Sequence, residues 1–279
     1  SCPGLSSTNW IKFLWSNFST FNLIFSFKYS QIEFIKSILQ ISLFPEIIES
    51  SLKGLTGKAF NKNHAKLNLV NLKEFSTNTY GSVDDTPYGG GEGMLIEIEP
   101  LKKSLDSIEK KGHVVNLSPQ GKLFNQNKAI EFAALKNITL ICGRYEGIDQ
   151  RFIDNYVDEE LSIGDYILSG GEIAASVVID SILRNIPGVI GNEDSVAKDS
   201  HSSGRLKGHS YTKPSDFNGL KVPKILLSGD HKKIEEWKIA NSLWVTKQKR
   251  PDLFKQIQLS EKEVILLRDY EYQLKQNEQ

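Results

Sequence analysis

The sequence predicts an α/β protein with a largely parallel β-sheet, and three observations lead to this fold class. Short apolar runs alternate with amphipathic segments from Ile41 onward, which is typical of strands connected by helices in a parallel sheet. Glycine-bearing loops follow the predicted strands. The 279 residues are 39% hydrophobic and 24% charged, which excludes collagen-like, low-complexity and strongly disordered chains and indicates a soluble globular protein.

Individual elements follow from the same patterns, taken in chain order. Apolar runs predict buried strands over residues 114–117 and 138–142, and helical spacing predicts helices over 127–135 and 173–183. Three glycine loops follow, at residues 118–121, 143–147 and 169–171. Because ligands bind at the carboxyl ends of strands in open α/β sheets, we expect a site at these loops.

The end of the chain has a different character. Residues 191–208 are rich in Ser, Gly and charged side chains without an apolar period, which predicts a linker. Helices are predicted over 230–247 and 260–275, the second opened by a capping box of Ser260 and Glu263. The predicted domains are therefore a main domain over 37–190, the linker, and a small helical domain over 209–279.

The first 36 residues are predicted to be an extension that precedes the main domain. The aromatic stretch over 10–27 is interrupted by Lys12 and several polar residues, so it lacks the continuous apolar run of a membrane-spanning helix. A basic start, a clean apolar run and a small-residue cleavage site are not evident either. We therefore expect neither a membrane segment nor a signal peptide.

Charge is balanced over the chain but segregated along it. Lys and Arg number 34, as do Asp and Glu, so no field of one sign covers the whole molecule. Residues 145–200 hold twelve acidic and three basic side chains, whereas 201–255 hold twelve basic and five acidic ones. The basic segment fits a solvated helix face or, with Tyr211, Trp237 and Trp244, a nucleic-acid contact.

The chain has two cysteines, Cys2 and Cys142, which are too few for a disulfide framework. This favours a reducing compartment, the cytoplasm.

Common phosphate-binding and hydrolase motifs do not fit. Gly57 and Lys58 suggest a Walker loop, but Leu52 replaces its first glycine and Ala59 replaces the residue that binds magnesium. The run over 89–93 lacks the register of a dinucleotide-binding fingerprint. Neither G-x-S-x-G nor H-E-x-x-H occurs. What remains is a set of glycine turns whose backbone groups can hold a small polar molecule.

Five ordered motifs resemble the bacterial tRNA (guanine-N1)-methyltransferase family TrmD. They are ISLFP over 41–45, DDTPYGGGEGM over 84–94, LSPQG over 117–121, ICGRYEGID over 141–149 and SIGDYILSGGE over 162–172. The similarity continues through IPGVIGNE over 186–193, YTKP over 211–214, LLSGDH over 226–231 and RPDL over 250–253. It runs from Ile41 to the C-terminal helix, although the segment over 203–210 is more basic than its counterpart in the family.

The resemblance implies a SPOUT-type knotted α/β domain followed by a small helical domain. Members of this family transfer a methyl group from S-adenosylmethionine to N1 of guanosine at tRNA position 37. They are homodimers whose active sites combine the knot of one subunit with the C-terminal domain of the other. A related knotted methyltransferase that acts at another RNA position, and an RNA-binding relative without activity, remain as alternatives.

The resemblance also assigns site residues. Asp199 matches the family's general base, and Arg184 matches an arginine that stabilises charge at guanine O6. Without the family, the favoured interpretations are a solvated linker acid for Asp199 and a surface ion pair for Arg184. No motif indicates a metal site. The residues expected to bind the cofactor are Leu117, Ser118, Pro119, Gln120, Gly121, Gly143, Tyr145, Glu146, Gly147, Ile163, Gly164, Asp165, Tyr166, Ile167, Leu168, Gly170 and Gly171.

Contacts with tRNA are expected at two further groups of residues. A loop near the active site and dimer interface is expected at Asp84, Pro87, Tyr88 and residues 89–93. Phosphates are expected at Lys213, His231, Lys247, Lys249 and Arg250.

Overall fold

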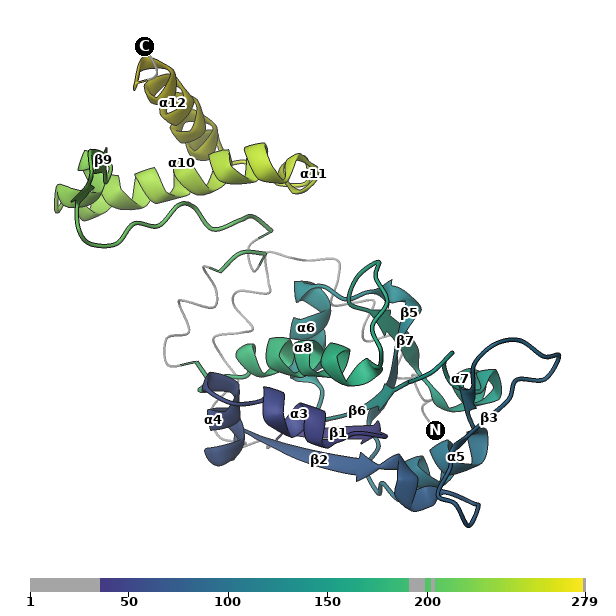
Figure 1. Ribbon diagram of the computed structural model, residues 1–279. Coiled ribbons are helices and arrows are strands. Elements are labelled where there is room, and N and C mark those ends of the chain that lie inside the picture. The colour runs from purple at the N-terminus through teal and green to yellow at the C-terminus, as the bar shows by residue number, and fades with distance from the viewer. Residues whose placement is uncertain (1–35, 191–198, 202–203, 278–279) are drawn as a thin grey trace, which may run out of the picture. The chain divides into compact units, whose positions relative to one another are not determined.

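A five-stranded parallel sheet forms the centre of residues 36–190. The computed structural model describes residues 36–190, 199–201 and 204–277 (Figure 1). The strands are β1 (Lys36–Ser42), β2 (Ala65–Asn71), β5 (His113–Leu123), β6 (Asn137–Cys142) and β7 (Glu159–Ser162). Their order in the sheet is β2-β1-β6-β5-β7, and each neighbouring pair is parallel. The predicted α/β class, the parallel sheet and both predicted strands are thus confirmed.

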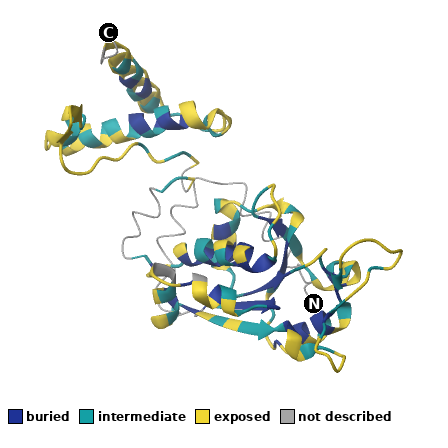
Figure 2. Cartoon of the chain, in the orientation of Figure 1, coloured by how far each residue is buried: buried dark blue, intermediate teal, exposed yellow. Residues whose placement is uncertain are grey.

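Helices cover both faces of this sheet. Side chains of α3 (Glu46–Ser51), α4 (Leu55–Asn61), α6 (Gln126–Ala134) and α8 (Gly171–Arg184) pack in one core cluster. Those of η1 (Leu72–Phe75), α5 (Ile98–Asp106) and α7 (Gln150–Tyr156) pack in the other. The strands are buried between these layers (Figure 2).

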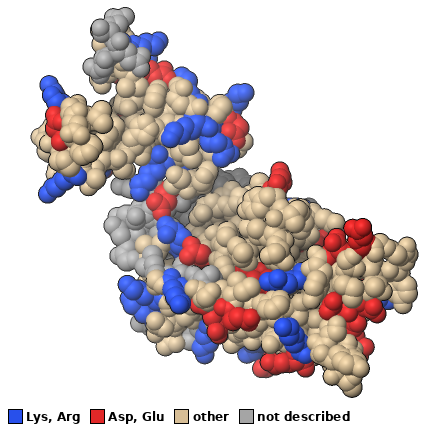
Figure 3. Space-filling model, viewed as in Figure 1, with Lys and Arg blue, Asp and Glu red and all other residues tan. Residues whose placement is uncertain are grey.

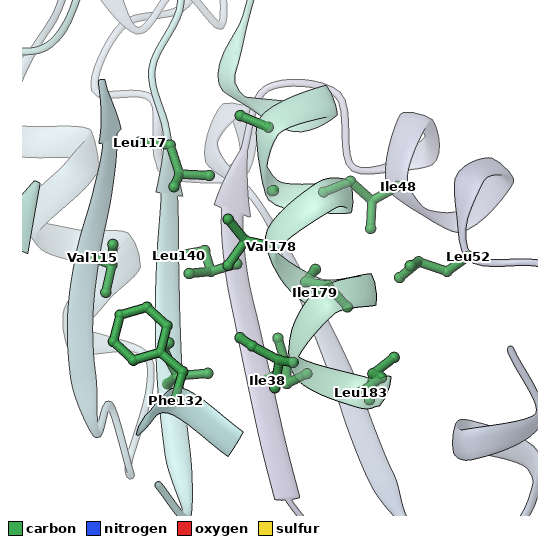
Figure 4. Packing of buried hydrophobic residues seen from close by; sticks show 14 of the residues in the cluster. Ile38, Ile48, Leu52, Val115, Leu117, Phe132, Leu140, Val178, Ile179 and Leu183 are labelled. Carbon is green, nitrogen blue, oxygen red and sulfur yellow. The ribbon is translucent and has the colours of Figure 1, made fainter. Parts of the chain in front are cut away.

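Alternation along the strands divides the core between the two faces. Ile38 and Leu140 belong to the cluster under α8, whereas their neighbours Leu39 and Ile141 belong to the opposite cluster. Figure 4 shows the strand residues facing Val178 and its neighbours on α8. Successive side chains of a strand point to opposite faces, so a strand that is apolar throughout requires helices on both sides.

One predicted loop lies within a strand. We expected residues 118–121 to form a loop after a strand that ends at Leu117, but β5 continues to Leu123. Its pairing with β7 is interrupted, because both Leu117 and Lys122 have Leu161 as their partner in the register. Pro119 cannot donate a hydrogen bond to a neighbouring strand. The intervening residues therefore bulge out of the sheet before pairing resumes.

The four predicted helices are present with small changes at their ends. The predictions 127–135 and 173–183 correspond to α6 and α8, and 230–247 and 260–275 correspond to α10 (His231–Lys249) and α12 (Glu261–Asn277). The capping box of α12 is confirmed: Ser260 Oγ accepts from Glu263 N at 3.3 Å, and Glu263 Oε2 accepts from Ser260 N at 3.0 Å. These two bonds satisfy amide groups that the helix itself leaves unpaired.

Short elements complete the described chain. Strands β3 (Asp84–Asp85) and β4 (Leu95–Ile96) pair antiparallel, as do β8 (Asp216–Phe217) and β9 (Leu220–Lys221). After η2 (Lys224–Leu227), helix α10 packs against α12, and α11 (Pro251–Phe254) lies between them in the sequence. Asn241 of α10 is fully buried, and its Nδ2 donates to the Tyr270 hydroxyl of α12 at 2.7 Å.

Two of the sequence predictions concern residues that the structure does not describe. The predicted extension over 1–36 lies outside the described residues apart from Lys36, which begins β1. Most of the predicted linker, residues 191–198 and 202–203, also lies outside them. Within the described ranges, none of the helices combines the length and the apolar character needed to cross a membrane.

Lys36 is a buried cation at the start of the sheet, and it makes stability depend on pH. Its side chain is 3% exposed, and its Nζ donates to the carbonyl oxygens of Phe132 and Leu135 at the end of α6. Burial lowers the pKa of this amine from its ordinary value of 10.5 to about 8. Between these two pH values the unfolded chain binds a proton that the folded chain does not, so the free energy of unfolding rises with pH.

We expect this rise to be absent in Lys36→Met. From pH 8 to 10.5 the wild type should gain at most about 3 kcal/mol relative to the variant, and below pH 8 the difference should be constant. Urea unfolding at several pH values measures this difference, with the exposed Lys66→Met as the control. Parallel pH profiles for wild type and Lys36→Met would contradict the assignment.

Candidate functional site

A cavity of about 580 Å³ opens at the carboxyl ends of β6 and β7 and at the bulge in β5. Fifteen of the seventeen residues expected to bind the cofactor line it: Leu117, Ser118, Pro119, Gln120, Gly143, Tyr145, Glu146, Gly147, Ile163, Gly164, Tyr166, Ile167, Leu168, Gly170 and Gly171. The three glycine segments, which are far apart in the sequence, therefore meet at the edge of the sheet where ligands bind in this fold class.

Two of the expected residues do not line the cavity. Gly121 lies against β7, where an added Cβ would be 2.4 Å from the Leu161 backbone nitrogen. Its role is therefore to allow β5 and β7 to come close after the bulge. Asp165 is exposed at the tip of its loop. The sequence motifs identified loops that line the cavity but could not separate lining residues from those that shape the turns.

Backbone hydrogen bonds fix the loops against one another. The amide of Gly171 donates to the carbonyl of Gly143 at 2.9 Å, which joins the start of α8 to the end of β6. Arg144 and Gly170 form an isolated antiparallel bridge. The Glu146 amide donates to the Met94 carbonyl at 3.0 Å, which ties the same loop to β4. The cavity wall is thus built from mutually bonded segments, and such walls preserve the shape of a binding site.

Several lining residues are absent from the sequence prediction. They include the polar residues Asn116, Arg144 and Glu160. Asn116 is 3% exposed and is opposite Glu160 in the β5–β7 register; its Nδ2 donates to Glu160 Oε1 at 2.8 Å. Only this register brings the two side chains together, and a single sequence does not give it. Arg144, in contrast, lies within the ICGRYEGID motif and could have been included.

Beneath the cavity lies a buried ion pair. Glu172, in the first turn of α8, is 1% exposed, and its Oε1 accepts from Ser42 Oγ at 2.7 Å and from Arg144 Nε at 3.2 Å. Cys142 ends β6 next to this pair, and burial raises the pKa of its thiol. The thiol is therefore protonated at neutral pH, which excludes Cys142 as a nucleophile.

The two expected catalytic residues contact each other but do not line this cavity. Arg184, the last residue of α8, donates from Nη2 to Asp199 Oδ2 at 2.9 Å. Lys207 Nζ is 3.4 Å from Asp199 Oδ1. Both residues are partly exposed. Asp199 is thus a carboxylate between two cations, and it is not among the described residues that line the cavity.

The residues expected to contact tRNA are mostly exposed. Tyr88, in the glycine-rich loop after β3, is 99% exposed, and Lys213, His231 and Lys249 are exposed as well. Lys247 Nζ instead pairs with Glu271 Oε1 at 2.7 Å. Figure 3 shows basic side chains on the part of the chain that carries α10 to α12.

Arg250 is held by an acidic neighbour. Its Nη2 is 2.7 Å from Asp252 Oδ2, and this guanidinium lowers the pKa of the Asp252 carboxyl to about 2. A phosphate at Arg250 would have to compete with that carboxylate. Within the ranges that the structure covers, no three His, Cys, Asp or Glu side chains are grouped as metal ligands.

Comparison with known proteins places this arrangement in a family. Residues 37–256 match the family described as tRNA (guanine-1)-methyltransferase TrmD. A tRNA (guanine-N(1)-)-methyltransferase of Lactobacillus delbrueckii subsp. bulgaricus is 46% identical over 239 residues, which are 86% of this chain and 96% of the relative. The enzyme of the same name from Buchnera aphidicola subsp. Schizaphis graminum is 51% identical, over 82% of this chain and 89% of its own.

A third relative extends the comparison. The tRNA (guanine-N(1)-)-methyltransferase of Brevibacillus brevis is 44% identical over 237 residues, which are 84% of this chain and 98% of the relative. The region matched by the family, residues 37–256, contains the parallel sheet except for Lys36, the three loops of the cavity, and the pair of Arg184 and Asp199. The chain therefore belongs to the tRNA (guanine-1)-methyltransferase TrmD family.

Proposed function

We propose that this protein transfers a methyl group from S-adenosylmethionine to N1 of guanosine at position 37 of tRNA. Membership of the family carries this proposal, because 220 residues of the chain, from 37 to 256, match it. The cavity supports the proposal. It lies where α/β sheets bind ligands, and its walls are loops with many accessible backbone groups.

The chemistry of the lining fits the methyl donor. Apolar Leu117, Ile163 and Leu168 can cover the face of an adenine, and backbone amides and carbonyls of the same loops can bind its edge. Glu146 and Glu160 can accept hydrogen bonds from an ammonium group. When bound, S-adenosylmethionine supplies a methyl group that its sulfonium has already activated. We further propose, from the family resemblance, that the three loops form the SPOUT knot.

The remaining chemical task is removal of the proton from guanine N1. We assign this to the Asp199 carboxylate, since a neutral N1 is a poor nucleophile and needs a base within hydrogen-bond reach. Arg184 then stabilises the negative charge that develops at O6. In guanine, N1 is bonded to C6, which carries O6, and Arg184 Nη2 is 2.9 Å from Asp199 Oδ2. The two groups are thus spaced to serve these neighbouring positions.

The proposed assembly is a homodimer in the cytoplasm. Asp199 and Arg184 are not among the described residues that line the cavity of their own chain. This supports an active site in which the cavity of one subunit receives Asp199 of its partner, as the family resemblance implies. In the same proposal the segment over 209–279 is a helical domain that binds tRNA through its exposed basic residues.

Methylation of two matched tRNA transcripts tests the proposal. With labelled S-adenosylmethionine, we expect 1-methylguanosine in a transcript with guanosine at position 37 and no product in one with adenosine there. Nucleoside analysis of the digested tRNA identifies the product. Equal labelling of both transcripts would indicate a methyltransferase that acts at another position, whereas donor binding without any transfer would favour an RNA-binding relative.

A further inference from the structure

Arg144 is a single positive charge in an otherwise neutral or acidic cavity. Among the described residues that line the cavity, it is the only Lys or Arg, while Glu146 and Glu160 supply two carboxylates. Its side chain is 19% exposed. Burying a cation to this extent costs free energy unless neighbouring groups compensate the charge. The groups around Arg144 therefore indicate its role.

Two groups hold the Arg144 side chain in place. Its Nε donates to Glu172 Oε1 at 3.2 Å, and its guanidinium carbon lies 4.3 Å from the centre of the Phe44 ring. Glu172 is itself fixed by Ser42 Oγ. Gly170 leaves the necessary space, since an added Cβ there would be 2.7 Å from Arg144 Nε and 2.5 Å from Glu172 Oε2. The guanidinium is therefore oriented before any ligand arrives.

The bond to Glu172 uses only one edge of the guanidinium. Arginine has five N–H donors, and the two Nη groups together form an edge that matches a carboxylate. Among the residues that the structure describes, none accepts a hydrogen bond from the Nη groups of Arg144. The side chain thus has a buried partner on one edge, and its remaining edge has donors without an acceptor among the described residues.

We propose that Arg144 binds the α-carboxylate of the methyl donor, and that Glu172 and Phe44 orient it for this contact. The inference rests on the proposed function, because it takes S-adenosylmethionine as the donor. That molecule carries one carboxylate and two cations, the ammonium and the sulfonium. The lining carries the complementary set, one guanidinium and the two carboxylates of Glu146 and Glu160. Such matching of charges favours this ligand over an RNA phosphate, for which two acidic neighbours would be repulsive.

Three ligands separate the carboxylate contact from the rest of the cavity. They are S-adenosylmethionine, its decarboxylated form, and 5′-methylthioadenosine, which lacks the whole amino-acid end. Calorimetry on the full chain measures their affinities. For the wild type we expect S-adenosylmethionine to bind about 10- to 100-fold more tightly than the decarboxylated form, as a charge-assisted bidentate contact requires.

Two variants test the proposed contact between Arg144 and the carboxylate of the methyl donor. The double substitution Arg144→Gln with Glu172→Gln removes both charges, so that no buried carboxylate is left unpaired. Arg144→Lys keeps the charge but loses the bidentate edge. We expect the preference for the carboxylate to fall to about one or below in the double variant and to be reduced in Arg144→Lys. The affinity for 5′-methylthioadenosine should change less than about threefold in both, which shows that the cavity is intact.

The outcomes distinguish the inference from the function on which it rests. A double variant that still prefers the carboxylate, or a wild type without that preference, would overturn the role of Arg144 while leaving the methyl donor in place. Equal weakening of all three ligands would identify Arg144 and Glu172 as purely structural and would also overturn it. A wild type that binds none of the three would remove the proposed donor, and the inference with it.

Discussion

Asp199→Asn is expected to lower the rate of methyl transfer to tRNA by about 10²- to 10⁴-fold, the usual contribution of a general base. Asparagine keeps the size of the side chain and a hydrogen bond to Arg184, but its amide cannot accept the proton of guanine N1. Because Asp199 is not among the residues that line the cavity of its own chain, the loss should appear in the chemical step. Affinity for S-adenosylmethionine should change less than about threefold.

A matched control is available on α5. Asp106 also lies between two cations, with Lys102 and Lys111 Nζ as its partners, and it is exposed. Asp106→Asn therefore removes a similar ion pair and should leave the rate within about twofold of the wild type, as expected for a surface pair. Single-turnover assays with saturating donor compare the two variants. Similar rates for Asp199→Asn and wild type would show that another group takes the proton.

Most of the helices and strands could be predicted because the spacing of apolar residues that marks them lies within short segments of the sequence. Residues 114–117 and 138–142 are apolar except for Asn116 and Thr139, because helices cover both faces of the sheet. The helices at α6, α8, α10 and α12 follow from apolar spacing and, for α12, from the pair of Ser260 and Glu263. The extension of β5 through Pro119 was not predictable. It depends on the pairing of Lys122 with Leu161, which is a contact between distant segments.

The same distinction holds at the candidate site. The glycine loops stand out in the sequence because their backbone conformation is encoded locally. The pair of Asn116 and Glu160 is formed by strand register, and the pair of Arg144 and Glu172 by the contact between β6 and α8. No spacing rule in one sequence connects these residues. The resemblance to a family supplied roles for Asp199 and Arg184, which composition alone would leave as surface residues.

The second large effect is expected when two inactive variants are mixed. If Asp199 acts in the cavity of the partner subunit, Asp199→Asn loses the base and keeps the cavity. A bulky residue at Gly143 should do the reverse, since an added Cβ there meets only Ile148 Cγ2 at 3.7 Å and the side chain would occupy the cavity. Gly143→Phe is therefore expected to fold but to lose binding of the donor and more than about 100-fold in rate.

A mixed dimer of these variants contains one intact site, made from the cavity of the Asp199→Asn subunit and Asp199 of the Gly143→Phe subunit. Random exchange makes half of the dimers mixed, so the mixture should recover roughly a quarter of wild-type activity. Denaturation and joint refolding allow the exchange, and chromatography verifies the dimer. The double variant mixed with wild type provides the control. If Asp199 acts across the interface, its mixed dimers contain no intact site, so only the quarter of dimers that are fully wild type should be active. No recovery from two folded, exchanging variants would place Asp199 in the site of its own chain, where closure of the described segments, rather than a partner, would have to bring the base to the guanine.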